Sequence, residues 1–144
     1  MAHHCKNALI TCMDFRLFNG FIKWMKEQGY AGDCDIISLA GAGKGIVDGG
    51  EAQSVLLKQL DISCNLHQSE KIILLHHSDC GAYAQSYKFA NAEEEKKKQL
   101  ADMNKAKKII VARYSETEVE LIWAQLKDKN GKEIVFTQIN TSLY

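Results

Sequence analysis

Several features that often indicate a function are missing from this sequence. It contains no proline, and its 18 lysine and arginine residues balance its 18 aspartate and glutamate residues. A formal net charge of zero gives no reason to expect a nucleic-acid partner or a membrane surface. No apolar run is long enough to span a bilayer, and the first residues lack the apolar stretch of a secretory signal. Without repeats, linkers or low-complexity segments, the 144 residues predict a single domain, residues 1–144.

Cysteine is present, with five residues in the chain. Cys12 and Cys80 each follow an apolar run and suit a role as thiolates, which favours a reducing, cytoplasmic location. The others have no useful spacing and are expected to pack as small apolar residues: Cys5, Cys34 and Cys64. His3 and His4 could form an extra metal pair, although an unstructured start of the chain is the favoured interpretation.

Two apolar runs end in turns that carry metal-binding residue types. Residues 72–75 lead to His77 and Cys80, and residues 8–11 lead to Cys12. A short apolar run bounded by polar residues suits a strand that is covered on both faces. If the two strands are neighbours in a parallel sheet, the three side chains meet at the carboxyl ends, where open α/β sheets place their sites.

Two thiolates and one imidazole form a typical zinc ligand set. The fourth tetrahedral position is left for a water or for Asp14. Zinc lowers the pKa of a bound water to about 7 in sites built from histidines, and two thiolates predict a somewhat less acidic water. Asp14 would then accept a hydrogen bond from zinc-bound hydroxide. Arg16 would hold the Asp14 carboxylate in a bidentate pair and keep it ionised.

Together the two motifs resemble the β-class carbonic anhydrases. The motifs are Cys-x-Asp-x-Arg at residues 12–16 and His-x-x-Cys-Gly at residues 77–81, and the resemblance extends from about Lys6 to Tyr83. It implies an enzyme that hydrates carbon dioxide reversibly to bicarbonate as a homodimer or higher homo-oligomer. The residues that it assigns are Cys12, His77 and Cys80 as zinc ligands and Asp14 and Arg16 as the catalytic dyad. In some members the dyad aspartate becomes the fourth zinc ligand.

The chain departs from the family pattern at three places. Phe15 stands where serine is usual, His76 where a small residue is usual, and only Ala-Gly remains of an Arg- or Lys-Asn-Ala-Gly motif at residues 38–41. A related hydrolase that acts on carbonyl sulfide or carbon disulfide is therefore an alternative. Alternation along an extended chain predicts that Phe15 packs in the core or a subunit contact and that His76 points away from His77.

Hydrophobic periodicity predicts the order of the elements. Strands are expected at 8–12, 34–39, 70–75, 119–126 and 134–139, with helices at 17–29, 51–66 and 83–114. Residues predicted to face inward include Trp24, Val55, Leu56, Leu60, Leu100, Met103 and Ile110, whereas Glu93, Glu94 and Glu95 belong to a solvated charged side. Asn130-Gly131 between the last two strands predicts a hairpin. The predicted fold is α/β, a central, mostly parallel β-sheet flanked by helices with a C-terminal antiparallel hairpin.

A glycine-rich loop at residues 40–50 suggests nucleotide binding as an alternative function. The dinucleotide motif, however, needs glycine at Ile46, and the P-loop needs serine or threonine at Gly45. The glycines are better interpreted as backbone freedom that lets the loop pass close to the metal site.

Other interpretations stay open. Cys12 could be a buried thiol, His77 a hydrogen-bonded turn residue, and Asp14 with Arg16 a structural ion pair. A zinc ion closed by Asp14 would make the chain a catalytically silent binding module.

Overall fold

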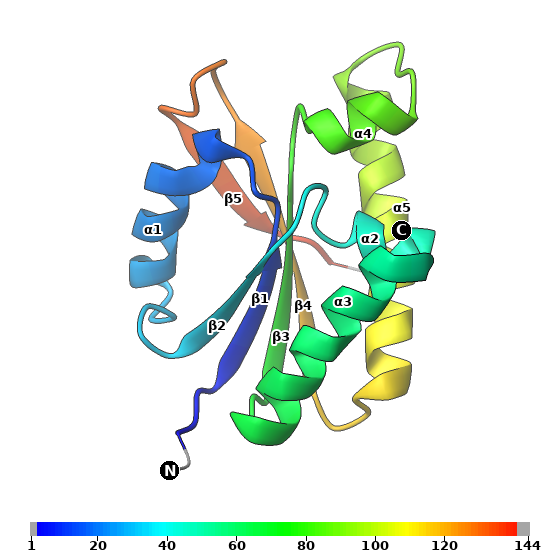
Figure 1. The fold of residues 1–144 in the computed structure, drawn as a ribbon. Helices are drawn as coiled ribbons and strands as arrows, with labels where there is room; N and C mark the ends of the chain where they lie inside the picture. The colour runs from blue at the N-terminus through cyan, green and yellow to red at the C-terminus, as the bar shows by residue number, and fades with distance from the viewer. Residues whose placement is uncertain (1–2, 141–144) are drawn as a thin grey trace.

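The structure, a computed structural model, describes residues 3–140 and is built around one five-stranded sheet (Figure 1). The strands lie in the order β2-β1-β3-β4-β5. Their bounds are β1 Asn7–Thr11, β2 Cys34–Ser38, β3 Lys71–His77, β4 Glu118–Leu126 and β5 Ile134–Gln138. The first four strands are parallel and β5 pairs antiparallel with β4. The predicted fold class is confirmed.

Helices cover both faces of the sheet. Their bounds are η1 Phe15–Leu17, α1 Phe18–Glu27, α2 Lys44–Asp48, α3 Gly50–Asp61, η2 Ile62–Leu66, α4 Gly81–Ser86 and α5 Ala92–Arg113. Figure 1 shows α1 on one side of the sheet and α2, α3 and α5 on the other. No helix within residues 3–140 is long and apolar enough to cross a membrane.

A separate apolar core fills each of the two interfaces. In β3, Ile72 and Leu74 join the core under α3 and α5, whereas Ile73 and Leu75 join the core under α1. This arrangement explains why the strand is apolar at successive positions. Trp24 in α1 stacks on a phenylalanine of β5 with ring centroids 5.1 Å apart, so its predicted role in the core is confirmed.

The prediction of one continuous helix over residues 83–114 is wrong, because residues 87–91 separate α4 from α5. The Asn91 side chain accepts the backbone N–H of Glu94 (2.9 Å), and the Glu94 carboxylate accepts the N–H of Ala90 (2.7 Å). This reciprocal cap starts a new helix at residue 92. The apolar positions predicted to face inward in α5 are buried, but Val55 in α3 is half exposed, contrary to prediction.

The predicted hairpin is confirmed, with a loop over residues 127–133. The Asp128 carboxylate shapes this loop by accepting three backbone N–H groups, those of Asn130, Lys132 and Glu133. Gly131 has a φ of +69° and packs against the backbone carbonyl of Arg16, where a Cβ atom would clash. The loop therefore supports the turn that follows β1.

Candidate metal centre

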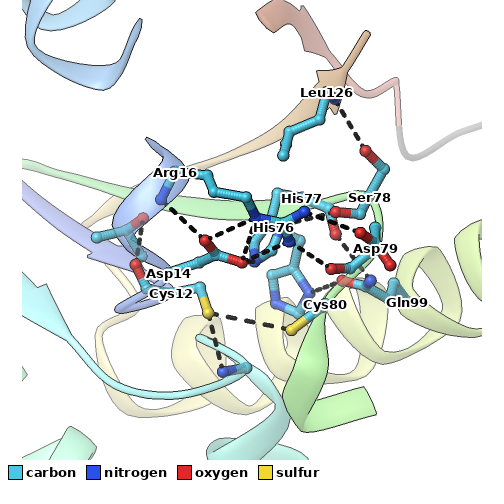
Figure 2. A network of polar contacts seen from close by, with 12 residues as sticks. Cys12, Asp14, Arg16, His76, His77, Ser78, Asp79, Cys80, Gln99 and Leu126 are labelled. Carbon is cyan, nitrogen blue, oxygen red and sulfur yellow. Dashed lines mark hydrogen bonds and ion pairs between the residues drawn. The ribbon is translucent and has the colours of Figure 1, made fainter. Parts of the chain in front are cut away.

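The turns after β1 and β3 bring two cysteines and a histidine together at one edge of the sheet. Cys12, His77 and Cys80 are all buried, and one ligand atom from each lies within 4.8 Å of the others. Figure 2 shows the two sulfur atoms facing each other. They lie 4.0 Å apart. Two thiolates on a tetrahedral zinc ion with bonds of about 2.3 Å would be about 3.8 Å apart. The spacing of the two sulfur atoms therefore fits zinc.

His77 presents a free nitrogen to this group. Its Nδ1 lies 2.7 Å from the carbonyl oxygen of Ser78, so Nδ1 carries the proton and Nε2 carries a lone pair. Among the described residues, His77 Nε2 is the one buried side-chain nitrogen or oxygen atom without a hydrogen-bond partner. Leaving such an atom unsatisfied costs about 1–3 kcal/mol. A metal ion at Nε2 removes that cost, and the bond at Nδ1 orients the ring for it.

The surroundings of the two thiols favour the binding of a cation, because they stabilise negative charge on the Cys12 sulfur. A hydrogen bond from Cys80 lowers the pKa of Cys12, and sharing of that proton raises the pKa of Cys80. The backbone N–H of Gly41 also points at the Cys12 sulfur, 3.4 Å away. The glycine-rich loop thus passes beside the site, as predicted, and stabilises negative charge on the sulfur.

Asp14 and Arg16 form an ion pair beside the group of Cys12, His77 and Cys80. Arg16 Nε lies 3.0 Å from Asp14 Oδ1, and Arg16 Nη2 lies 2.7 Å from Asp14 Oδ2. These hydrogen bonds are the main reason that the pKa of Asp14 is lowered, so the carboxylate stays ionised. Asp14 Oδ2 lies 3.8 Å from His77 Nε2, which places the carboxylate next to the open side of the group.

Arg16 also binds the other turn. Its Nη1 contacts the Asp79 carboxylate at 2.8 Å, and its Nη2 donates to the Asp79 backbone carbonyl at 2.8 Å (Figure 2). Asp79 has a φ of +56°, in the left-handed region that aspartate tolerates better than most residues. Arg16 therefore joins the two turns that carry the cysteines. Sequence reasoning missed Asp79, although its place between His77 and Cys80 was a usable signal.

Helix α5 holds the second turn from the opposite side. The Glu95 carboxylate accepts the backbone N–H of Cys80 (2.9 Å) and that of Asp79 (3.2 Å). Gln99 donates to the His77 carbonyl (2.9 Å) and to Glu95 (2.8 Å). The sequence predicts that Glu95 belongs to a solvated charged side of the helix, and that prediction is wrong. The Glu-x-x-x-Gln spacing puts both residues on one helix face, but only the tertiary structure aims them at the turn.

His76 points away from His77, as predicted. The N–H of Gly43 donates to His76 Nε2 (3.0 Å), and His76 Nδ1 bonds to the Gln99 side-chain oxygen (2.9 Å). Burial lowers the pKa of His76 to about 4, so the ring is neutral and uses both nitrogens in hydrogen bonds. It therefore ties the glycine-rich loop to α5.

The prediction that Phe15 packs in the core is wrong, because 86% of its surface is exposed in the single chain, whereas a subunit contact stays a prediction. The strand ends at Thr11 and the chain turns into η1, so alternation no longer decides where Phe15 points. With neighbours such as Phe18 and Ile36, it lines an apolar groove of about 330 Å³ that reaches Cys12. The apolar groove therefore leads to the candidate metal centre.

Removal of the Glu95 carboxylate tests the support from α5. Glu95→Ala should lower zinc affinity by about 10- to 100-fold, the usual cost of losing a group that orients metal ligands. The reason is that two backbone N–H groups of the metal-binding turn lose their acceptor. Competition with a chromophoric chelator measures the affinity. Glu93→Ala, at an exposed position in the same first turn of α5, is the control and should match the parent.

Comparisons with known proteins give a family for the sequence and relatives for the fold. The sequence model of the family described as "Putative carbonic anhydrase" matches residues 2–134. An uncharacterized protein of Rickettsia bellii is 33% identical over 122 residues, which cover 81% of this chain and 74% of that protein.

Solved structures show the same fold at low identity. One is from a study of two tetrameric β-carbonic anhydrases of Sordaria macrospora, with a TM-score of 0.59 at 10% identity, covering 96% of this chain and 82% of the other. Another is the apo form of a carbon disulfide hydrolase, with a TM-score of 0.53 at 13% identity, covering 92% and 82%. The match to the family model over nearly the whole chain decides the assignment: this chain belongs to the carbonic anhydrase family that the model describes.

Proposed function

We propose that this protein binds zinc through Cys12, His77 and Cys80 and catalyses the reversible hydration of carbon dioxide to bicarbonate. The observation that carries the proposal is the unpartnered, buried His77 Nε2, which faces two thiols and lies 3.8 Å from the Asp14 carboxylate. Membership of a carbonic anhydrase family supports the choice of reaction.

Zinc with an open fourth position makes hydroxide available near neutral pH. The chain's own residues then decide how it is used. Asp14 accepts a hydrogen bond from the attacking water and so aims a lone pair of that water at the substrate. Arg16 keeps Asp14 ionised and fixes its plane through the two-point contact. The apolar groove lets an uncharged gas approach the centre.

We infer that Asp14 acts as this acceptor and leaves the fourth position to water. Both of its carboxylate oxygens are held by Arg16, and Oδ1 also accepts the Arg16 backbone N–H (2.9 Å). Asp14 would have to give up several of these contacts to become a zinc ligand. Each hydrogen bond to a charged group contributes about 1.5–3 kcal/mol.

Hydrolysis of carbon disulfide or carbonyl sulfide is the second candidate. The groove favours it, because its exposed wall is built from apolar side chains such as Met13, Phe15 and Phe18. Such a wall suits small apolar substrates and offers bicarbonate few hydrogen-bond donors. A catalytically silent zinc module is the remaining alternative.

Zinc analysis combined with stopped-flow assays separates these functions. The proposal expects zinc at the Cys12 centre and hydration of carbon dioxide that a chelator abolishes and added zinc restores. Hydrolysis of carbon disulfide or carbonyl sulfide without hydration would favour the second candidate. Bound zinc with none of these activities between pH 6 and 9 would indicate the silent module.

We further propose that the protein forms a homodimer through the surface around η1, α1 and β2. Met13 and Phe18 are each 67% exposed there, next to Phe15, and β2 is an edge strand of the sheet. Large exposed apolar side chains that gather on one surface indicate a protein contact. A second copy of the chain would cover them and narrow the groove.

Phe18→Glu tests this interface. Burying a phenylalanine contributes about 1.5–3 kcal/mol, so a charge in its place should weaken the dimer on the order of 100-fold. Sedimentation velocity over a range of protein concentrations measures the change. The control is Val111→Glu, at an exposed apolar position on α5, which should leave the dimer intact. Equal association of the parent and the Phe18 variant would contradict the interface.

A further inference from the structure

A second group of metal-binding side chains lies at the opposite end of the sheet. Cys5 precedes β1, Asp35 is the second residue of β2, and His67 follows η2. These are the amino ends of the strands, whereas the Cys12 centre lies at the carboxyl ends. One ligand atom from each of the three residues lies within 4.8 Å of the other two.

The donors suit zinc. His67 Nδ1 lies 2.7 Å from Asp35 Oδ2, and the Cys5 sulfur completes a set of one thiol, one imidazole and one carboxylate. Sulfur and imidazole ligands select zinc over the harder magnesium and calcium ions. All three residues are partly buried, so the group is shielded but can be reached from solvent.

Buried hydroxyl groups orient these donors. The Ser63 hydroxyl donates to Asp35 Oδ2 at 2.7 Å and is hydrogen-bonded to the Ser69 hydroxyl at 2.6 Å. The Ser69 oxygen lies 3.5 Å from the Cys5 sulfur. Outer contacts of this kind hold metal ligands in place and raise affinity.

The start of the chain supplies a fourth donor. The ring of His3 lies beside that of His67, with centroids 4.9 Å apart, and His3 is exposed and able to change its rotamer. In addition, the backbone N–H of Cys5 donates to the His67 carbonyl at 3.0 Å, which fixes the first segment against η2. Residues His3 and Cys5 therefore contact His67, which the sequence did not lead us to expect.

We propose that Cys5, Asp35 and His67 bind a second zinc ion, independent of the Cys12 centre, and that His3 completes the four-coordinate shell. Binding releases the Cys5 thiol proton to solvent and replaces the contact between His67 and Asp35 by bonds to the metal. A shell closed by four protein ligands has no open position, so this zinc is structural. It fastens the chain start and η2 to the edge strand β2.

Zinc stoichiometry tests the second site. Native mass spectrometry of the zinc-loaded protein should find two ions per chain in the parent, one in Cys5→Ser, one in Cys12→Ser and none in the double variant. Cys64→Ser is the matched control, since this half-buried thiol lies outside both groups, and it should keep two ions. Cys5→Ser should also keep the parent's rate of carbon dioxide hydration.

The result separates the two proposals. If only the Cys12 centre exists, the parent and Cys5→Ser each hold one ion, and the second site is overturned. If only the second site exists, Cys12→Ser keeps the parent's single ion and Cys5→Ser loses it. Asp35→Asn keeps the size of the side chain and can still accept from Ser63. Asp35→Asn should lower the zinc affinity of this site by more than about 100-fold, which exceeds the cost of losing an outer contact. Unchanged zinc affinity in this variant would also overturn the proposal.

Discussion

Cys80→Ser is expected to remove zinc from the Cys12 centre and to destabilise the fold by several kcal/mol. A serine hydroxyl is a weak ligand, and metal-binding free energy at such a site is also folding free energy. At a free zinc concentration 1,000 times the dissociation constant, the lost stabilisation is about 4 kcal/mol. Metal analysis after gel filtration measures occupancy, and thermal unfolding with and without a chelator measures the stability.

The matched control for this variant is Cys34→Ser. Cys34 is another partly buried free thiol that packs against the same core as Cys80 but lies outside the metal group. Its replacement should leave zinc content unchanged, and a chelator should still lower its melting temperature. A Cys80→Ser protein that holds as much zinc as Cys34→Ser would refute the ligand assignment.

Arg16→Ala is expected to lower turnover by about 100-fold or more while zinc stays bound. This loss of turnover is as large as the loss caused by removing one positioned acid–base group, because Asp14 loses its orientation. The pH profile should change too. Arg16 is the main cause of the lowered pKa of Asp14, so in its absence Asp14 protonates at higher pH. The acid limb of kcat/KM should therefore move to higher pH.

Two further variants make this result specific. Arg113→Ala removes a similar two-point arginine–aspartate pair, with Asp61, from the far end of α5 and should leave turnover unchanged. Arg16→Lys keeps the charge without the planar fork and should fall between the parent and Arg16→Ala. Unchanged turnover in Arg16→Ala, with activity measurable in the parent, would exclude the proposed role.

The fold could be predicted because its strands can be recognised in the sequence as short apolar runs. The apolar runs that became β1 and β3 could only be covered on both faces, which requires a parallel sheet between helices. Predictions failed where a local contact overrode periodicity. The cap at Asn91 divided one expected helix into two, and the turn into η1 brought Phe15 to the surface.

The candidate site likewise contains residues that the sequence predicts and residues that only the structure identifies. Cys12, His77 and Cys80 converge because they lie at or just after the ends of the neighbouring strands β1 and β3, and strand ends can be recognised in a sequence. Glu95 lies 15 residues beyond Cys80 on a helix, and its contact with the turn depends on how that helix packs. No sequence periodicity predicts a contact between residues at this separation, so the residues that support the site could be identified only from the structure.

The two adjacent histidines at the end of β3 also bear on how the strand finds its register. Because residues 72–75 are all apolar, sliding the strand by one residue would exchange its faces with little change in hydrophobic burial. It would also turn His76 toward the cysteines. In the native register His76 hydrogen-bonds to Gly43 and Gln99 on the opposite face. Correct assembly of the candidate metal site thus rests partly on a histidine that lies outside the site.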